Sequence, residues 1–199
     1  MDNKLIYEFS SQKTDGDASL SNLLGGKGAN LAEMSKLGIQ VPPGFTITTE
    51  ACNYFSKNKK LPDGLKEEII NYVSNLESLS QKSFGNSESP LLLSVRSGGM
   101  ISMPGMMDSI LNIGLNDDNV QNLAKAFNDE RFALDSYRRL IQMYSNVVLG
   151  VEMDRFEAVI ANKKRMDNVT SDADFNVEQL EWIINAYKNT VERFTNSPF

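Results

Sequence analysis

The chain has 199 residues, a formal net charge of −6 and no histidine. This length suits one domain or two small ones. The acidic balance argues against nonspecific nucleic-acid binding, and the single cysteine, Cys52, excludes an internal disulfide and a cysteine-based metal cluster. No apolar run approaches the length of a membrane span or a signal peptide. We therefore expect a cytoplasmic protein that binds neither nucleic acid nor membranes, with Cys52 as a buried structural thiol.

Strands and helices alternate in the first part of the chain. The pattern predicts first a strand at 5–9, a helix at 28–37 stopped by Gly38, an extended segment at 39–48 and a short helix at 49–55. A longer helix at 65–84 follows, with Asp63 as its N-terminal cap and Gly85 at its end, and then strands at 91–95 and 110–115. Such alternation with few strands favours a small mixed sheet.

The second part of the chain has only helical periodicity. One helix covers 132–148, a second begins at Asp154 with Glu157 as a capping box, a polar loop spans 162–173, and a last helix opens at Asn176. The predicted class is α+β, with subdomains at 1–114 and 115–199, the second all-helical.

The stretch around Arg96 contains residues that suit phosphate binding. An apolar run, Leu91 to Val95, predicts a buried strand that delivers Arg96 into a loop with several glycines and a proline. A guanidinium offers a planar fork of donors suited to phosphate oxygens, and glycines let backbone N–H groups approach an anion. The alternative is a salt bridge that holds the loop.

A second cationic segment, Gly-Gly-Lys-Gly at 25–28, precedes the first predicted helix. A helix N-terminus attracts anions, and Lys27 adds a full charge there. The spacing differs from a Walker A loop, because Gly28 and not Ser or Thr follows the lysine. The alternative is a solvated lysine at a helix start.

Several strings together resemble the pyruvate, phosphate dikinase family. They are Gly-Gly-Lys-Gly-Ala-Asn-Leu-Ala-Glu-Met at 25–34, Val-Pro-Pro-Gly-Phe-Thr-Ile-Thr-Thr at 41–49, Ser-Val-Arg-Ser-Gly at 94–98, Ser-Met-Pro-Gly-Met-Met-Asp at 102–108, and later strings at 130–139 and 146–150. The string at 102–108 is the most specific. The shorter strings Gly-Gly-Lys-Gly and Val-Pro-Pro-Gly-Phe within the first two are shared with phosphoenolpyruvate synthases and glucan, water dikinases. The resemblance runs from about residue 5 to the end of the chain.

The resemblance implies part of an ATP-grasp nucleotide-binding domain. Members of the family interconvert ATP, pyruvate and phosphate with AMP, phosphoenolpyruvate and diphosphate through a phosphohistidine, using Mg²⁺ with ATP. A chain without histidine cannot form that intermediate, so we expect the catalytic histidine outside this chain and this part to be inactive alone. The implied partners are ATP, the remaining domains of the same polypeptide and, for the full-length enzyme, a second copy in a homodimer.

By resemblance, the ATP-binding residues are Lys27, Arg96, Gly105, Met106, Met107, Asp108 and Ser109. The last five belong to a loop that closes over the polyphosphate, in which the Ser109 hydroxyl can donate to an oxygen. No residue of this chain is assigned as a metal ligand, Asp108 included. The arginines at 131, 138 and 139 read as a solvated basic helix face or a domain contact. Two other functions remain open: a phosphoenolpyruvate synthase-like ATP-binding part, and a noncatalytic interaction module.

Overall fold

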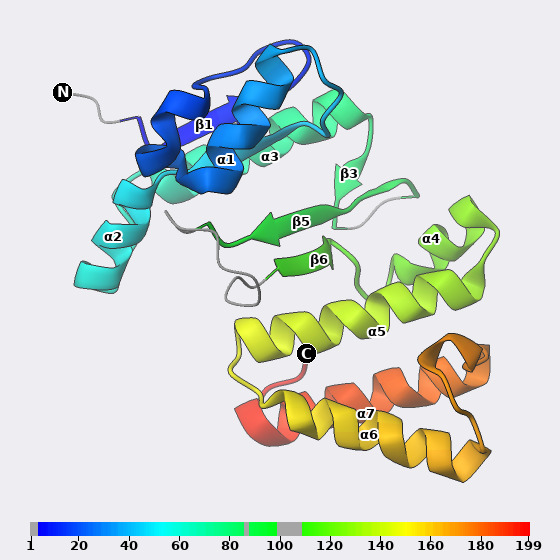
Figure 1. Cartoon of the computed structure of the whole chain (residues 1–199). Helices are drawn as coiled ribbons and strands as arrows, with labels where there is room; N and C mark the ends of the chain where they lie inside the picture. The colour runs from blue at the N-terminus through cyan, green and yellow to red at the C-terminus, as the bar shows by residue number, and fades with distance from the viewer. Residues whose placement is uncertain (1–3, 86–87, 99–108) are drawn as a thin grey trace. The chain divides into compact units, whose positions relative to one another are not determined.

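The computed structural model describes residues 4–85, 88–98 and 109–199, and it contains both helices and short strands (Figure 1). The α+β class predicted from the sequence is therefore confirmed at this level. The chain forms two compact units. The first comprises Met1–Gln81 with Ser97–Met107, and the second comprises Lys82–Arg96 with Asp108–Phe199.

The first unit is built on a pair of antiparallel strands. Its elements are β1 (Ile6–Phe9), the short 3-10 helix η1 (Ala18–Leu20), α1 (Ser21–Lys36), β2 (Gly44–Ile47), α2 (Thr49–Asn58) and α3 (Leu65–Ser80). β1 pairs with β2 over four residues, and α1 contacts both strands. A small core forms where Ile6, Ala51 and Leu65 are buried together.

Helix α1 begins earlier than predicted and contains a break. It runs from Ser21, but Gly25 has φ 69° and ψ 163°, a conformation that is essentially restricted to glycine. The C-terminal stop at Gly38 is confirmed: this residue has φ 77°, and the Ile39 N–H donates to the Met34 oxygen over 3.0 Å. These contacts form the usual left-handed termination of a helix.

Gly28 is required for the close approach of α1 to β2. A Cβ atom at this position would lie 2.7 Å from Thr46 Cγ2, whereas a Cβ at Gly26 would meet nothing within 4 Å. We expect Gly28→Ala to lower the free energy of unfolding by about 1–3 kcal/mol through overpacking. Gly26→Ala should be neutral or stabilising by up to about 1 kcal/mol, because alanine favours helix. Urea unfolding followed by far-UV circular dichroism measures both; equal effects of the two changes would contradict this packing role.

Three expectations for this region are wrong. Helix α3 ends at Ser80 because Gln81 turns left-handed at φ 54°, and Ser83–Phe84 instead form β3, which pairs in parallel with β4 (Pro90–Leu91). Asp63 does not cap α3; the capping position is Gly64, with no side-chain hydrogen bond. Cys52 is exposed, not buried, because it lies on the solvent side of α2.

The second unit combines two strand pairs, β3–β4 and β5 (Leu93–Arg96) with β6 (Ser109–Ile113), and helices that run alongside one another (Figure 1). Its further elements are α4 (Val120–Phe127), α5 (Glu130–Val147), α6 (Met153–Asp167), the 3-10 helix η2 (Asp172–Asp174) and α7 (Val177–Thr195). β5 pairs antiparallel with β6, and β6 packs against α5. The ring of Phe156 contacts that of Tyr187 edge-to-face at 4.8 Å, and neither residue is exposed.

The strands of the second unit share the core of its helices. Ile110 and Leu115 are each 6% exposed and belong to the same hydrophobic cluster as the helical residues, with Leu92 and Ile113 packed against it. The compact units therefore divide the chain differently from the predicted domains 1–114 and 115–199, which stay a prediction. Residues 109–199 are all described, and no strand occurs between residues 132 and 191.

The helices of the second unit were only partly predicted. The start of α7 is confirmed, since Asn176 and Gln179 form a reciprocal capping box. Helix α4 was not predicted. Helix α6 starts at Met153 without a side-chain cap and continues through most of the predicted loop 162–173. Contacts of Lys163 support the continuation: its ammonium pairs with Asp167 over 2.8 Å and lies 4.9 Å from the Trp182 ring of α7.

The expected solvated basic face of α5 is wrong for Arg138, which is buried, whereas the Arg139 side chain is 59% exposed. Arg138 is 4% exposed, and its guanidinium contacts the Asp135 carboxylate at 2.8 Å. Asp135 also pairs with Arg139 over 2.6 Å. Arg131 donates to the backbone oxygen of Phe175 over 2.9 Å. Burial opposes the charge on Arg138, but Asp135 outweighs it and raises the pKa of the guanidinium. Through these contacts the three arginines bind other residues of the second unit.

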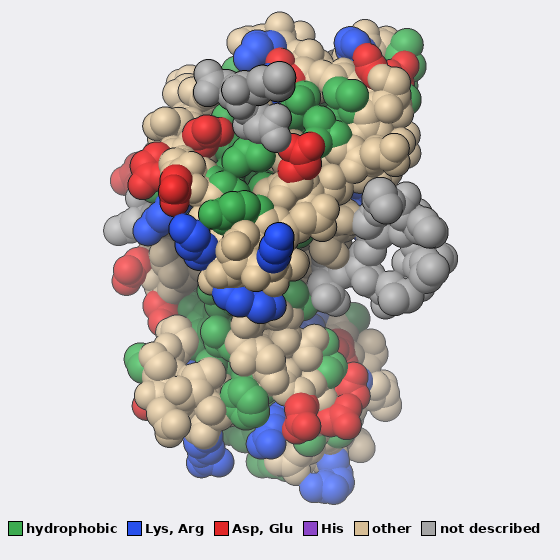
Figure 2. Space-filling view, turned by 90° about the vertical axis from the view of Figure 1, so that its left-hand side faces the viewer, with side chains coloured by type: hydrophobic (Ala, Val, Ile, Leu, Met, Phe, Trp, Pro, Cys, Tyr) green, Lys and Arg blue, Asp and Glu red, His purple; other side chains and the backbone are tan. Residues whose placement is uncertain are grey.

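Charges of both signs are interspersed with hydrophobic side chains on the face shown in Figure 2. Among the described residues, no helix has the combination of length and apolar character that crossing a bilayer demands.

Candidate phosphate-binding site

Arg96 is the last residue of β5 and is exposed to solvent. The predicted strand 91–95 is divided between β4 and β5 and is less buried than predicted: Leu91 of β4 is 8% exposed, but Val95 of β5 is 53% exposed. The apolar run therefore buries only its first part, and Arg96 projects from the exposed end of a short hairpin. Its planar donor group is available to an anion from solvent.

The strand register brings Arg96 and Ser109 together. They are directly opposed residues of the antiparallel pair β5–β6. Opposed residues of such a pair point to the same face of the sheet. The arrangement therefore combines a guanidinium fork with a hydroxyl that both donates and accepts, two groups suited to adjacent oxygens of one phosphate chain.

Lys27 lies in the first unit, just after the break in α1 at Gly25. Its side chain is partly exposed, and its ammonium is 3.5 Å from the backbone oxygen of Ser97. Because of the break, the helical segment after Gly25 has its own N-terminal end, which lies next to Lys27. The sequence had predicted that this helix starts at Gly28. The charge of Lys27 has no carboxylate partner among the described ion pairs.

Four predicted residues, Gly105, Met106, Met107 and Asp108, lie outside the described residues. Of the predicted set, the structure thus brings together Arg96 and Ser109 and describes Lys27 separately. Sequence reasoning missed two supporting residues. They are Thr46, which lies against Gly28, and Asn112, a residue of β6 with a left-handed φ of 60°. A signal for the second was available in the Asn-Ile-Gly turn pattern at 112–114.

The described residues form no cluster of three or more His, Cys, Asp or Glu side chains that could hold a metal ion.

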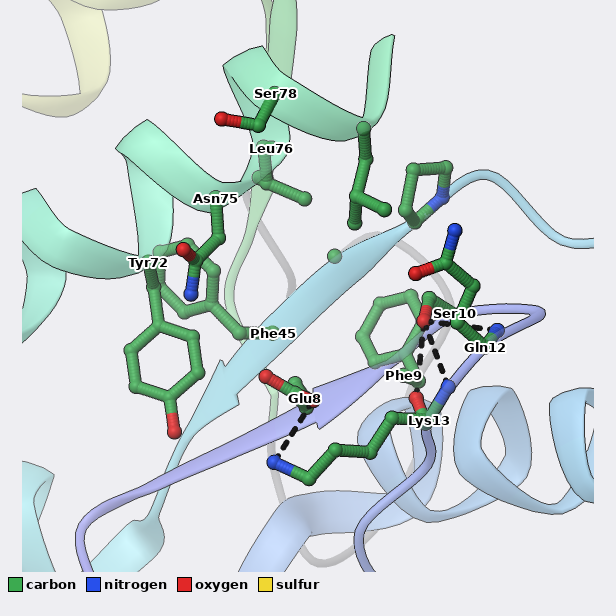
Figure 3. Close-up of a pocket in the computed structure, with 13 residues that line it drawn as sticks. Glu8, Phe9, Ser10, Gln12, Lys13, Phe45, Tyr72, Asn75, Leu76 and Ser78 are labelled. Carbon is green, nitrogen blue, oxygen red and sulfur yellow. Dashed lines mark hydrogen bonds and ion pairs between the residues drawn. The ribbon is translucent and has the colours of Figure 1, made fainter.

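A cavity of about 290 Å³ in the first unit lies between β1, β2 and α3 (Figure 3). Its charged residues satisfy one another, because the Lys13 ammonium pairs with the Glu8 carboxylate over 2.9 Å. The cavity wall includes Phe45 and Tyr72, whose rings lie 5.4 Å apart. Neither Lys27 nor Arg96 lines it, so this cavity is separate from the predicted phosphate site.

Comparison with known proteins assigns the class. Residues 21–83 match a family model described as pyruvate phosphate dikinase, AMP/ATP-binding domain. The pyruvate, phosphate dikinase of Rickettsia conorii is 46% identical over 98% of this chain and 23% of its own length. The enzyme of Rickettsia prowazekii is 50% identical over 94% of this chain and 21% of its length. The enzyme of Clostridium symbiosum is 46% identical over 97% and 22%.

Residues 21–83 are thus similar to a nucleotide-binding domain family. The chain as a whole corresponds in sequence to the N-terminal part of the pyruvate, phosphate dikinases and spans about a fifth of the length of these relatives. The resemblance seen in the sequence is confirmed.

Proposed function

We propose that this chain is the part of a pyruvate, phosphate dikinase that grips the phosphates of ATP. The observation that carries the proposal is the pairing of Arg96 with Ser109 at the exposed end of β5–β6, in a chain similar to these enzymes throughout. The parent enzyme would interconvert ATP, pyruvate and phosphate with AMP, phosphoenolpyruvate and diphosphate. No observation favours the synthase-like or the noncatalytic alternative.

The chemistry asked of these residues is positioning and charge stabilisation. Phosphoryl transfer spreads negative charge over the transferred group, so cations and oriented donors supply most of the catalysis. Arg96 would clamp two oxygens, and Ser109 would donate to a third. A role for Lys27 in ATP binding stays a prediction. Magnesium would arrive with the nucleotide and neutralise part of its charge.

The rest of the reaction would need other parts of the enzyme. This chain has no histidine, so the phosphohistidine belongs to the remaining domains, which we propose as its intramolecular partners. An ATP-grasp completion of the nucleotide cleft, a homodimeric full-length enzyme and a cytoplasmic location are part of the same proposal.

ATP binding by the 199-residue chain tests the proposal. We expect weak binding in isothermal titration calorimetry with Mg²⁺ present, competed by inorganic tripolyphosphate and not by adenosine, and no turnover with pyruvate. Arg96→Gln should weaken ATP binding about 10-fold to 100-fold, the scale of a lost charge-assisted hydrogen bond. Arg155→Gln is the matched control, because Arg155 is an exposed arginine paired with Glu152. Equal affinity of the Arg96→Gln variant and the unaltered chain would contradict the proposal.

A further inference from the structure

The register of β5–β6 is interrupted by one extra residue. Leu93 is opposite Ile113, Val95 is opposite Ile110, and Arg96 is opposite Ser109. The chain advances by two residues on β5 and by three on β6 between the first two pairs. Strand β6 therefore contains a β-bulge, a feature that redirects the side chains beyond it.

Asn112 supplies the backbone conformation of this bulge. Its φ of 60° is left-handed, a region that asparagine tolerates and β-branched residues avoid. Its side-chain Nδ2 donates to the Ser136 oxygen of α5 over 3.5 Å. Its own carbonyl oxygen accepts a hydrogen bond from the Leu115 N–H over 3.1 Å. The bulge is thus tied both to the helix beneath it and to the turn that follows.

The bulge decides which residue faces Arg96. Regular pairing continued from Leu93 and Ile113 would place Ile110 opposite Arg96. With the extra residue, Ile110 is 6% exposed in the core with Ile113 packed on the same cluster, and Ser109 takes the place opposite Arg96. Adjacent strand residues point to opposite faces, so Ser109 and Arg96 share the face away from Ile110.

We propose that Asn112 is a positioning residue for the triphosphate of a nucleotide. It acts through the bulge, which sets a hydroxyl opposite the guanidinium and keeps Ile110 out of the phosphate site. This inference rests on the proposed function, since it names the residue that arranges that same site. Asn112 itself does not touch the ligand.

Two substitutions at Asn112 separate backbone conformation from side-chain chemistry. Glycine keeps the left-handed conformation without strain, whereas valine disfavours it and favours regular strand. Asn168→Val is the matched control: Asn168 is an exposed residue of the second unit with φ 56°, at the end of α6. It should impose a similar backbone strain without altering β5–β6.

The first measurement is the cross-strand backbone NOE in the chain without ligand. We expect an Arg96–Ser109 NOE in the unaltered chain, in Asn112→Gly and in Asn168→Val. In Asn112→Val it should give way to an Arg96–Ile110 NOE. Fluorescence of Trp182, the single tryptophan of the chain and a residue of α7, checks that the second unit remains folded in each variant. An Arg96–Ser109 NOE retained in Asn112→Val would overturn the inference.

The second measurement is ATP titration of the same proteins with Mg²⁺. We expect about a tenfold or greater loss of affinity in Asn112→Val, the scale of one charge-assisted hydrogen bond, and near-unaltered affinity in the other two variants. Unaltered affinity in Asn112→Val with a shifted register would also overturn the positioning role. Absence of ATP binding in the unaltered chain would instead refute the proposed function, while the NOE comparison would still decide whether Asn112 sets the register.

Discussion

Replacing Arg96 by lysine is expected to slow the ATP-dependent half-reaction of the complete dikinase roughly a hundredfold or more. Lysine keeps the positive charge but loses the planar fork that can hold two phosphate oxygens. A contact of this kind, strengthened as charge redistributes during phosphoryl transfer, contributes about 2–4 kcal/mol. Single-turnover formation of AMP, with purified enzyme at saturating ATP and phosphate, measures the effect.

Two comparisons make the Arg96→Lys result specific. The exchange between pyruvate and phosphoenolpyruvate should be spared, because we propose that other domains carry it out. Arg155→Lys, at an exposed ion pair of α6, should leave both half-reactions unchanged. If Arg96 only braces its loop, the substitution would lower thermal stability and leave AMP formation near normal, and that result would remove Arg96 from the site.

Removing the carboxylate of Asp135 should be among the most destabilising single changes in the second unit. Asp135 contacts two arginines, and one of them, Arg138, has a side chain that is only 5% exposed. In Asp135→Ala, that guanidinium keeps Asp172 only at 3.7 Å and Gln142 at 3.3 Å. An incompletely compensated buried charge costs about 3–5 kcal/mol. Urea unfolding followed by Trp182 fluorescence reports the loss.

A double substitution tests the cause of that loss. Asp135→Leu combined with Arg138→Met removes both buried charges and fills the space with apolar groups, which should restore much of the stability. Glu152→Ala, which breaks an exposed pair with Arg155, should change stability by less than about 1 kcal/mol. A double variant no more stable than Asp135→Ala would show that packing, and not the uncompensated charge, dominates.

Three local signals in the sequence predicted local structure correctly. The capping box at Asn176 and Gln179, the stop at Gly38 and the strand that ends at Arg96 are all confirmed. Each depends on one or a few neighbouring residues whose backbone or side-chain chemistry permits little else. The family and the α+β class were also within reach, because several specific strings occur in one order.

Features that depend on distant residues were missed. Cys52 was predicted to be buried and Arg138 to be exposed, and both predictions are wrong. The exposure of each residue depends on the helix face on which it lies. The extended part of α6 carries Lys163, which lies against Trp182 of another helix. The bulge at Asn112 depends on the need to bury Ile110 and Ile113 together. Periodicity along one element does not contain these relations.

The shared core of strands and helices in the second unit sets where the chain can be truncated. A fragment that starts at residue 115 would lack β5 and β6, and the surface that Ile110 covers would face water. A fragment that starts at Ser109 would keep β6 but leave its hydrogen-bonding edge unpaired. An unpaired edge promotes intermolecular association and precipitation. Expression of the helices as a well-behaved protein therefore calls for a start no later than Lys82, where the compact unit itself begins.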